Sequence, residues 1–444
     1  MDQLYRLSLV EAARRLAVGD LTGETYTRGL QLRIRELDDN VQAWAWMDPA
    51  YAIARAKEAD DRVRAGRTPG AMHGLPIGVK DIIAVRGVPT GMGSAIYDGY
   101  IPEQNAEVVD RLHAAGALVM GKTVTTEFAF MVPSKTRNPW NPAHTPGGSS
   151  SGSAAAVACG MVPAAIGTQT NGSVIRPAAF CGVVGYKPGK GVLSTEGILP
   201  FSPALDQVGV FARSVEDTAL LVAHLAHSRW TISPQISALK HAPRLVAVRS
   251  PVWHLATEDQ RNRYAMDVAG LREAGAVIEE IELPGSFHDA HKVHRTIMLY
   301  EAAACSRAVR ERHANKMSEL VRTALAEGDR ISAAEYDRAM KKKEALERDF
   351  SRFLDDFDAA VTPPATGEAP ASLETTGDPS FCTIWTVLGV PAITIPTGLG
   401  SQGLPMGLQI IGNQGESNHL LATAMWCERQ LPFRNLLARE TDLL

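Results

Sequence analysis

The sequence predicts an α/β protein in which helices pack on a largely buried sheet. Short apolar runs bounded by Gly or Pro alternate with stretches of helical periodicity over much of the 444-residue chain. One unit is clear: residues 244–248 read as a strand, a helix ends near Gly275, and residues 276–281 read as a second strand. Such alternation is typical of sheets covered by helices.

The first 66 residues predict helices that cover a core and carry no chemistry. Ser8 and Glu11 have the spacing of a capping box, and the apolar positions between Leu9 and Leu16 fall on one helical face. A second amphipathic helix is expected between Tyr26 and Leu37.

From Leu75 onward the pattern changes to short strands and helices. The apolar run 75–79 predicts a strand that ends by placing Lys80 beside a turn. Residues 107–115 predict a helix, and the run 117–120 after it predicts a buried strand. Further along, Ser214 has the spacing of a helix cap, and charged helical stretches dominate residues 229–352.

The composition is that of an ordinary globular protein, with 45% hydrophobic and 21% charged residues. A net charge of −4 and a pI near 6.3 predict no binding of nucleic acid or of anionic membranes. The N-terminus has no apolar signal core, and no later segment is long and apolar enough to span a bilayer. The five scattered cysteines favour reduced thiols. We therefore expect a cytoplasmic protein with small-molecule partners.

Two small polar clusters, residues 147–152 and 168–173, flank the apolar run 154–158, which predicts a helix that ends at Gly160. Such clusters allow close backbone approach and present many hydroxyl and N–H groups, although tight Gly/Ser turns without function have the same composition. Lys80 upstream adds a reason to expect catalysis. A serine hydroxyl is a poor nucleophile until a base removes its proton, and a neutral lysine can be that base.

At these residues the sequence resembles the amidase signature family of Ser-cisSer-Lys amide hydrolases. The matching segments are GLPIGVKD around Lys80, GKTVTTEFA (121–129), NPWNPAHTPGGSSSGSAAAVA (138–158), GTQTNGSVIRPAAFCGVVGYKP (167–188) and GVPAITIPTGLGSQGLPMGLQIIG (389–412). The resemblance implies a large mixed central sheet with helices on both faces.

It also implies one amidase domain over residues 1–444. Within it we expect an N-terminal helical part (1–66), a signature core (67–228), a variable helical or α/β part that shapes the substrate pocket (229–352), and a C-terminal return to the core (353–444).

In this family the residue at Ser173 is the nucleophile, the one at Ser149 is a bridging hydroxyl held by a cis peptide, and the one at Lys80 is the general base. The activity implied is hydrolysis of a carboxamide to an acid and ammonia through an acyl-enzyme. No metal or organic cofactor is implied. The expected partner is a small amide substrate, with a homodimer as the default assembly.

This mechanism sets physical conditions that the residues can be tested against. Burial must lower the pKa of Lys80 from about 10.4 toward neutrality. Asp81 would oppose that change, but on an extended strand it points to the opposite face. A cis peptide before Ser149 costs about 2.5–4 kcal/mol, and Gly147 and Gly148 would relieve the clashes around it.

By the same resemblance, the backbone N–H groups of Thr170, Asn171, Gly172 and Ser173 form the oxyanion hole. Most relatives have glycine where this chain has Asn171. Asn tolerates positive φ better than other non-glycine residues, so we expect the same turn here. The Asn171 side chain is expected to narrow the pocket.

Gln169 and Arg176 are the expected substrate-binding residues. Many relatives have Asp at the first position, and GTQT-x-GSVIRPA resembles a malonamidase-type branch in which the equivalent arginine binds a substrate carboxylate. The alternative is that Arg176 anchors its loop through backbone carbonyls. The first interpretation favours a small carboxylate-bearing amide of the malonamate or ureido-acid kind.

Three further patterns are weaker. Residues 116–123 fit a phosphate-loop motif, but the expected strand lies where the loop should be. Residues 148–152 fit a hydrolase nucleophile elbow without a preceding strand. His288, His291 and His294 are spaced for one helix face, where a polar surface is expected rather than a metal site.

Two other functions stay open at this point. One is the amidase subunit of a glutamine-dependent tRNA amidotransferase, and the other is a non-catalytic binding protein on the same fold.

Overall fold

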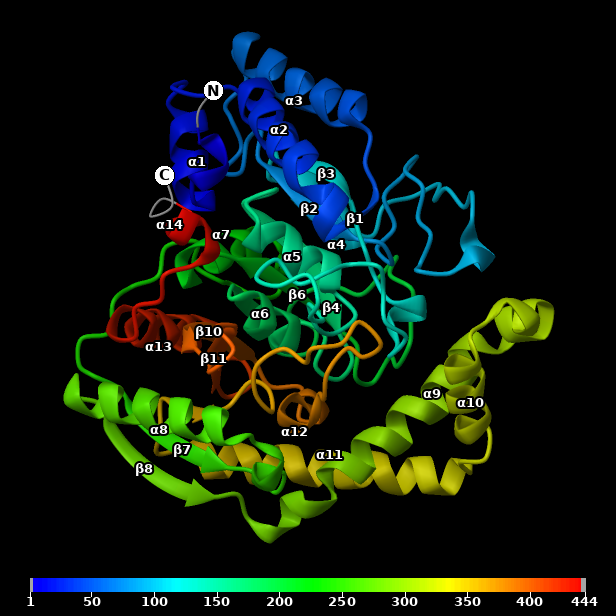
Figure 1. The fold of residues 1–444 in the computed structure, drawn as a ribbon, viewed down its shortest axis with the longest axis vertical. Coiled ribbons are helices and arrows are strands. Elements are labelled where there is room, and N and C mark those ends of the chain that lie inside the picture. The colour runs from blue at the N-terminus through cyan, green and yellow to red at the C-terminus, as the bar shows by residue number, and fades with distance from the viewer. Residues whose placement is uncertain (1–2, 441–444) are drawn as a thin grey trace.

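A mixed sheet of eleven strands runs through residues 3–440, the part of the chain that the computed structural model describes (Figure 1). The strand order is β1-β3-β2-β4-β6-β5-β10-β11-β9-β7-β8. The strands are β1 (Trp44–Trp46), β2 (Pro76–Lys80), β3 (Leu118–Thr123), β4 (Ala164–Gln169), β5 (Val184–Lys187), β6 (Gln207–Ala212), β7 (Arg244–Arg249), β8 (Val277–Glu282), β9 (Ala359–Thr362), β10 (Ala392–Leu399) and β11 (Pro405–Ile411).

The sheet has two parallel groups joined by antiparallel strands. β2 is parallel to β3 and β4, and β7 is parallel to β8 and β9. Between these groups, the pairings from β4 through β6, β5, β10 and β11 to β9 are antiparallel. This arrangement confirms the α/β class and the large mixed sheet.

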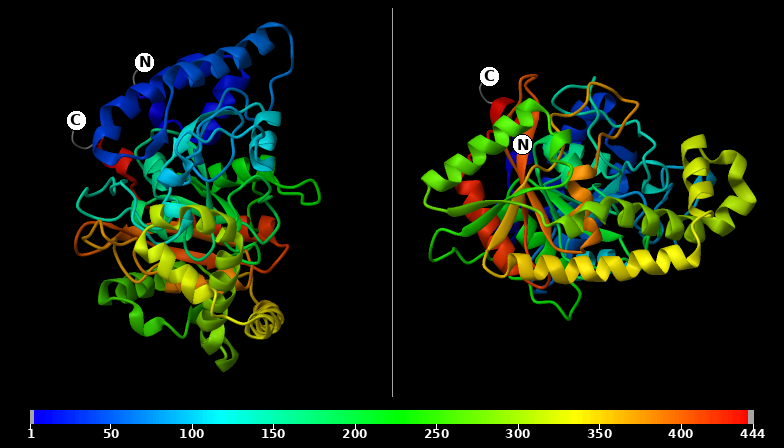
Figure 2. Two further views of the ribbon diagram at one scale, coloured as in Figure 1. Left: turned by 90° about the vertical axis from the view of Figure 1, so that its right-hand side faces the viewer. Right: turned by 90° about the horizontal axis from the view of Figure 1, so that it is seen from below.

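The helices cover both faces of the sheet (Figures 1 and 2). They are α1 (Leu9–Ala17), α2 (Gly23–Val41), α3 (Pro49–Arg64), α4 (Glu107–Ala114), α5 (Ser151–Ala158), α6 (Ile175–Cys181), α7 (Val215–Leu225), α8 (Glu258–Glu273), α9 (Ala290–His313), α10 (Glu319–Gly328), α11 (Ala333–Leu354), α12 (Ser380–Val387), α13 (Ser417–Gln430) and α14 (Leu436–Glu440). Single turns of 3-10 helix lie at Leu4–Arg6, Ala95–Tyr97, Glu127–Ala129, Trp253–Leu255, Gly285–Asp289 and Ala314–Lys316.

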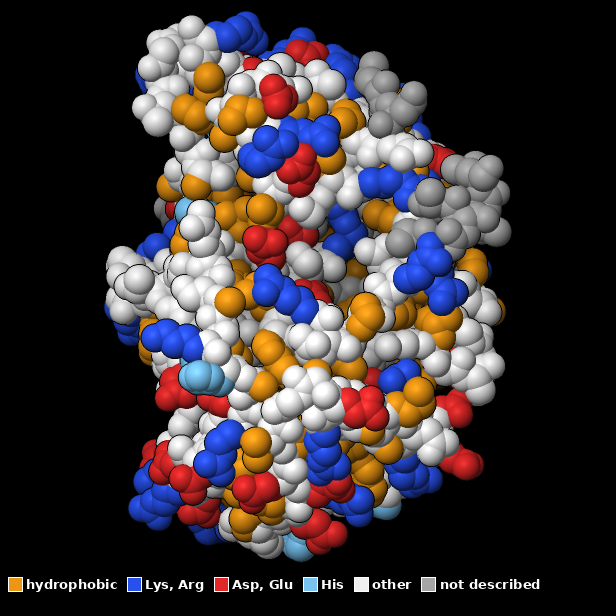
Figure 3. All heavy atoms as spheres, turned by 90° about the vertical axis from the view of Figure 1, so that its left-hand side faces the viewer, with side chains coloured by type: hydrophobic (Ala, Val, Ile, Leu, Met, Phe, Trp, Pro, Cys, Tyr) orange, Lys and Arg blue, Asp and Glu red, His pale blue; other side chains and the backbone are white. Residues whose placement is uncertain are grey.

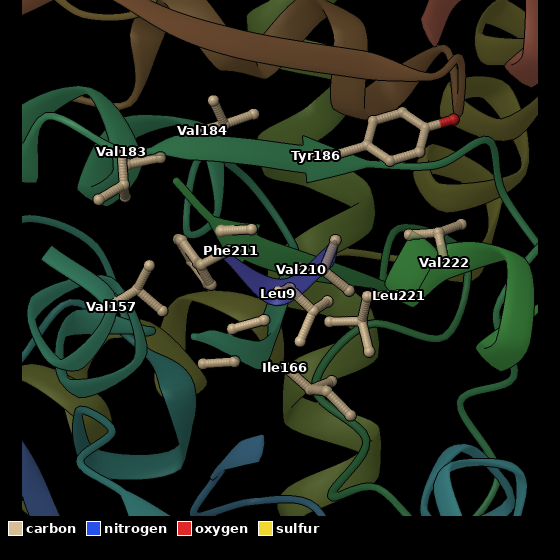
Figure 4. Close-up of a cluster of buried hydrophobic side chains, with 14 of the residues drawn as sticks. Leu9, Val157, Ile166, Val183, Val184, Tyr186, Val210, Phe211, Leu221 and Val222 are labelled. Carbon is tan, nitrogen blue, oxygen red and sulfur yellow. The ribbon is translucent and has the colours of Figure 1, made fainter. Parts of the chain in front are cut away.

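Strand β6 shows why both faces need cover, since its side chains alternate between two helices. Figure 4 shows Val210 toward Leu221 of α7 and Phe211 toward Val157 of α5. All four side chains are buried. α5 is buried along its whole length, which explains its small and apolar sequence.

The N-terminal prediction was incomplete. α1 begins where expected, with the Ser8 hydroxyl accepting the Glu11 N–H. The segment 1–66, however, also contains β1, which pairs antiparallel with β3. Three residues between two helices are too few to show a strand period, so the sequence pattern missed this edge strand.

The middle of the chain forms an arm. α9, α10 and the start of α11 extend away from the sheet (Figure 1), while α12 packs on α9 beside the core. Acidic and basic side chains are interspersed on the face of the molecule shown in Figure 3. None of the helices in residues 3–440 is both long and apolar enough to cross a membrane.

Gly152 offers a test of packing at the start of α5. A Cβ at this position would lie 2.3 Å from the Val124 nitrogen and 2.4 Å from the Ala43 oxygen. We expect Gly152→Ala to lower the free energy of unfolding by about 3 kcal/mol, because neither backbone can move aside, although alanine has the higher helix propensity. Urea denaturation measures the change.

The matched control is Gly285→Ala, where nothing lies within 4 Å of the new carbon. It should change stability by no more than about 0.5 kcal/mol. Equal stabilities for the two variants would contradict the close contact at Gly152.

Candidate active site

Lys80 is the last residue of β2 and is fully buried inside the sheet. Its Nζ lies 2.7 Å from Ser149 Oγ and 2.7 Å from Thr168 Oγ1. Burial holds the pKa of Lys80 well below its usual value, and the Asp206 carboxylate opposes this only in part. The lowered pKa favours the neutral amine, which is the form that can accept a proton.

Asp81 does not contact Lys80. Its carboxylate pairs with Lys122 of β3 at 3.2 Å and accepts the Gly91 N–H at 3.0 Å. Asp81 lies in the turn directly after β2, and its carboxylate is engaged by Lys122 and Gly91, so the nearest anion in sequence is directed away from the lysine as expected.

Ser149 and Ser173 meet in two loops at the sheet, one before α5 and one before α6. The Ser149 backbone N–H donates to Ser173 Oγ at 3.0 Å, and both side chains are buried. The structure thus joins Lys80, Ser149 and Ser173, the three residues expected to form the triad.

The expected cis peptide before Ser149 is wrong for this structure. Residues 3–440 contain no cis peptide bond, so Ser149 follows Gly148 through the trans bond that non-proline residues favour. The turn is made instead by Gly147 at φ 93°, where a Cβ would lie 2.8 Å from Pro177 Cα. The amide of Ser149, not its hydroxyl, contacts Ser173 Oγ.

Thr168 is a site residue that the sequence analysis did not assign. It reaches Lys80 because β4 pairs in parallel with β2, with Val79 opposite Ile166. The only signal in the sequence was its place in the polar cluster 168–173, since strand pairing cannot be read from local periodicity.

The loop expected to form the oxyanion hole has free donors. Within the described residues, the backbone N–H groups of Asn171, Gly172 and Ser173 donate to no protein acceptor. Asn171 is not among the positive-φ residues, so the turn does not need the tolerance expected of asparagine. Its side-chain oxygen accepts the Thr383 hydroxyl of α12 at 2.7 Å.

Gln169 has a different role from the substrate contact expected of it. Its side-chain oxygen accepts the N–H groups of Val174 and Ile175 at 2.8 and 3.0 Å, and its Nε2 donates to Thr386 at 3.0 Å. The side chain is buried. The amide therefore braces the turn after the nucleophile.

Arg176 is buried beside the nucleophile loop. Its Nη1 donates to the Gly377 oxygen at 2.7 Å, its Nη2 lies 3.4 Å from Thr376 Oγ1, and its Nε has no partner among the residues that the structure describes. No carboxylate forms an ion pair with it in residues 3–440. Burial lowers the pKa of Arg176 to about 10, which still leaves it charged at neutral pH.

The three weaker motifs do not form sites. β3 occupies the phosphate-loop pattern from Leu118 to Thr123, as predicted. Ser150, the central serine of the elbow pattern, accepts the Thr168 N–H at 3.2 Å and donates to the Thr168 oxygen at 3.1 Å. The described residues contain no group of three metal-ligating side chains.

The expected polar face of the three histidines is only partly correct. His294 is buried, and its Nε2 lies 2.8 Å from the Thr170 oxygen. His291 reaches the Ser380 oxygen at 3.0 Å. Nothing in the sequence distinguished His294 from a surface histidine, because its burial depends on the first turns of α9 packing against the nucleophile loop, which is distant in sequence.

Comparisons with known proteins agree with the fold. A family model described as Amidase matches residues 25–421. A glutamyl-tRNA(Gln) amidotransferase subunit of Chloroflexus aurantiacus is 33% identical over 472 residues, covering 95% of this chain and 96% of that protein. The same amidotransferase subunit from Geobacillus stearothermophilus is 32% identical, with 93% of each chain covered.

Solved structures show the same similarity. A crystal structure of an amidase superposes with a TM-score of 0.87 at 32% sequence identity, covering 96% of this chain and 100% of that one. The peptide amidase of Stenotrophomonas maltophilia gives a TM-score of 0.81 at 29% identity, with 96% of each chain covered.

The lowered pKa of Lys80 predicts a pH dependence of stability. Between its lowered folded pKa and its usual value near 10.5, the unfolded state binds more protons than the folded state. Stability should therefore rise with pH in this window, by up to about 1.4 kcal/mol per pH unit. In Lys80→Met this contribution is absent, so the stability difference between wild type and variant should move in favour of wild type as pH rises.

Urea denaturation of both proteins at several pH values from neutral to 10 measures that difference. All other titrating groups are shared and cancel. A difference that stays constant across this range would mean that Lys80 is charged in the folded protein.

Proposed function

The chain belongs to the amidase family, and from this premise we propose that it hydrolyses the carboxamide of a small substrate through a Ser173 acyl-enzyme. One observation carries the proposal: a buried lysine with a lowered pKa lies 2.7 Å from Ser149 Oγ, and the Ser149 N–H contacts Ser173 Oγ at 3.0 Å. These contacts support assigning Lys80 as the base, Ser149 as the relaying hydroxyl and Ser173 as the nucleophile.

In the proposed reaction, Ser173 Oγ attacks the amide carbon while its proton passes through the Ser149 hydroxyl to Lys80 Nζ. The carbonyl oxygen becomes an oxyanion that accepts the free N–H groups of the loop around Gly172. The C–N bond then breaks, the proton returns through Ser149 to the nitrogen, and ammonia leaves. Water attacks the ester of Ser173 by the same route and releases the acid.

The relay requires the Ser149 hydroxyl to approach Ser173 Oγ, which receives the Ser149 N–H in the structure. That N–H supports the chemistry in another way. It donates to the oxygen that gains negative charge as the proton leaves, so it favours the nucleophilic form of Ser173.

We further propose that Arg176 binds a carboxylate on the substrate, as in the malonamidase-type branch. A Cβ built on Gly148 would lie 2.9 Å from Ser173 Cα and 3.0 Å from Arg176 Nη2, so the nucleophile and the guanidinium border the same small space. A buried charge without an anionic partner is unfavourable, and a substrate carboxylate would supply that partner. The proposed substrates are small amides of the malonamate or ureido-acid kind.

The second candidate function is that of the amidase component of a tRNA amidotransferase. It is favoured by the amidotransferase subunits from Chloroflexus and Geobacillus, whose similarity extends over nearly the whole of both chains. Such a component would hydrolyse glutamine and would work with partner proteins, whereas the first function needs only this chain, which we propose to be a homodimer.

Ammonia release from a panel of small amides, with and without a carboxylate and including glutamine, tests these proposals. Ser173→Ala should lose at least about 1,000-fold in kcat on every substrate, because the variant lacks the oxygen that forms the acyl-enzyme. Arg176→Ala should lose activity on carboxylate-bearing amides by about 100-fold, mainly through KM, and should retain it on neutral amides.

Arg263→Ala is the control, since Arg263 is a partly buried arginine of α8 that pairs with Asp267 instead of lying near Ser173. Equal loss on all amides in Arg176→Ala would assign the arginine to loop anchoring and end the carboxylate proposal. Activity on glutamine alone, in a chain that copurifies with other proteins, would favour the amidotransferase. Light scattering of the same preparation gives the assembly.

A further inference from the structure

His294 holds one carbonyl of the nucleophile loop from behind. Its Nε2 lies 2.8 Å from the Thr170 oxygen, and because a carbonyl can only accept, Nε2 carries the hydrogen. The ring is 2% exposed. Burial lowers the pKa of His294 to about 4, so the imidazole is neutral at neutral pH and keeps this one donor fixed.

Thr386 of α12 holds the next carbonyl. Its hydroxyl donates to the Asn171 oxygen, which is nearer than the Cys382 oxygen one helical turn back. The same hydroxyl accepts Gln169 Nε2 at 3.0 Å, which fixes its orientation. Thr386 is 1% exposed.

The geometry of the peptide bond connects these two contacts to catalysis. In a trans peptide unit the C=O and the N–H point in opposite directions. The unit that presents its oxygen to His294 therefore presents the Asn171 N–H to the other side. In the same way, the unit held by Thr386 presents the Gly172 N–H away from α12.

A third contact holds the loop through the side chain of Thr170. The Thr170 hydroxyl donates to Asp206 at 2.5 Å, and the Asp206 carboxylate also accepts the N–H groups of Phe201 and Ser202 at 2.9 Å each. Thr170 is therefore held at both its carbonyl and its side chain, and its peptide plane has little freedom to rotate.

We propose that His294 and Thr386 are positioning residues that aim the Asn171 and Gly172 N–H groups at the substrate oxyanion. This inference rests on the proposed function of the loop. Neither side chain needs to touch the substrate, because each acts through the peptide unit that it holds. Donors fixed before the reaction stabilise developing charge most effectively, so loosening either unit should slow acylation.

The test uses a fluorophosphonate probe, so that it does not depend on the identity of the substrate. Ser173 Oγ forms a bond to phosphorus while its proton passes through Ser149 to Lys80. The P–F bond breaks, fluoride leaves, and the phosphoryl oxygen occupies the oxyanion hole. The second-order rate of labelling at Ser173, followed by mass spectrometry, then reports on the same donors.

Two pairs of variants separate a lost donor from a lost fold. His294→Leu and Thr386→Val remove the donor, whereas His294→Gln and Thr386→Ser keep one at nearly the same position. We expect the first pair to label about 10- to 100-fold more slowly than wild type and the second pair to stay within about threefold. Thermal unfolding checks that the two variants of His294 are equally folded, and likewise the two variants of Thr386.

His291→Leu is the matched control, because His291 lies one turn earlier on α9 and reaches the carbonyl of Ser380 instead of the nucleophile loop. It should label at the wild-type rate. Wild-type labelling in both His294→Leu and Thr386→Val, with no labelling in Ser173→Ala, would overturn the positioning role and leave the nucleophile intact. Labelling that persists in Ser173→Ala would instead overturn the proposed function.

Discussion

The burial of Lys80 at the end of β2 is the constraint on which the rest of the site depends. A charged ammonium inside the sheet would need an anion, and the described residues offer its Nζ only the hydroxyls of Ser149 and Thr168. Asp81, in the turn directly after β2, is paired with Lys122 instead. The nearest acidic residue in sequence is thus kept away from Lys80, as the base role that we propose for this lysine requires.

Around this lysine, the site is divided between reacting groups and the groups that hold them. β2 and the loops before α5 and α6 supply the three residues that we assign to the chemistry. α9 and α12 contribute His294 and Thr386, which bind carbonyls of the nucleophile loop from the far side. Both helices lie outside the Gly/Ser-rich segments: α9 belongs to the variable part of the chain and α12 to its C-terminal part. Segments far apart in the sequence thus hold the nucleophile loop.

The sequence predicted those elements that depend on local pattern or on family resemblance. The strand ending at Lys80, the helix after Ser149 and the α/β alternation all follow from periodicity and Gly/Pro placement, and each is present. What it missed depends on contacts between distant segments. Thr168 meets Lys80 through strand pairing, and His294 is buried because the first turns of α9 pack against the nucleophile loop. Gln169 accepts two N–H groups from the residues that follow the loop, a contact that the strand pattern does not predict.

Two buried basic side chains lie near Ser173, and burial lowers the pKa of each to a different extent. The difference bears on the substrate that we propose. Burial holds the pKa of Lys80 well below its usual value, which favours the neutral amine. Burial also lowers the pKa of Arg176, but only to about 10, so the guanidinium stays charged with one carbonyl and one hydroxyl as partners. A neutral amide would leave the guanidinium without a carboxylate in direct contact, since the Asp378 carboxylate acts on it only from a distance. A substrate that brings its own carboxylate would neutralise it on binding, and the same ion pair would orient the amide toward Ser173.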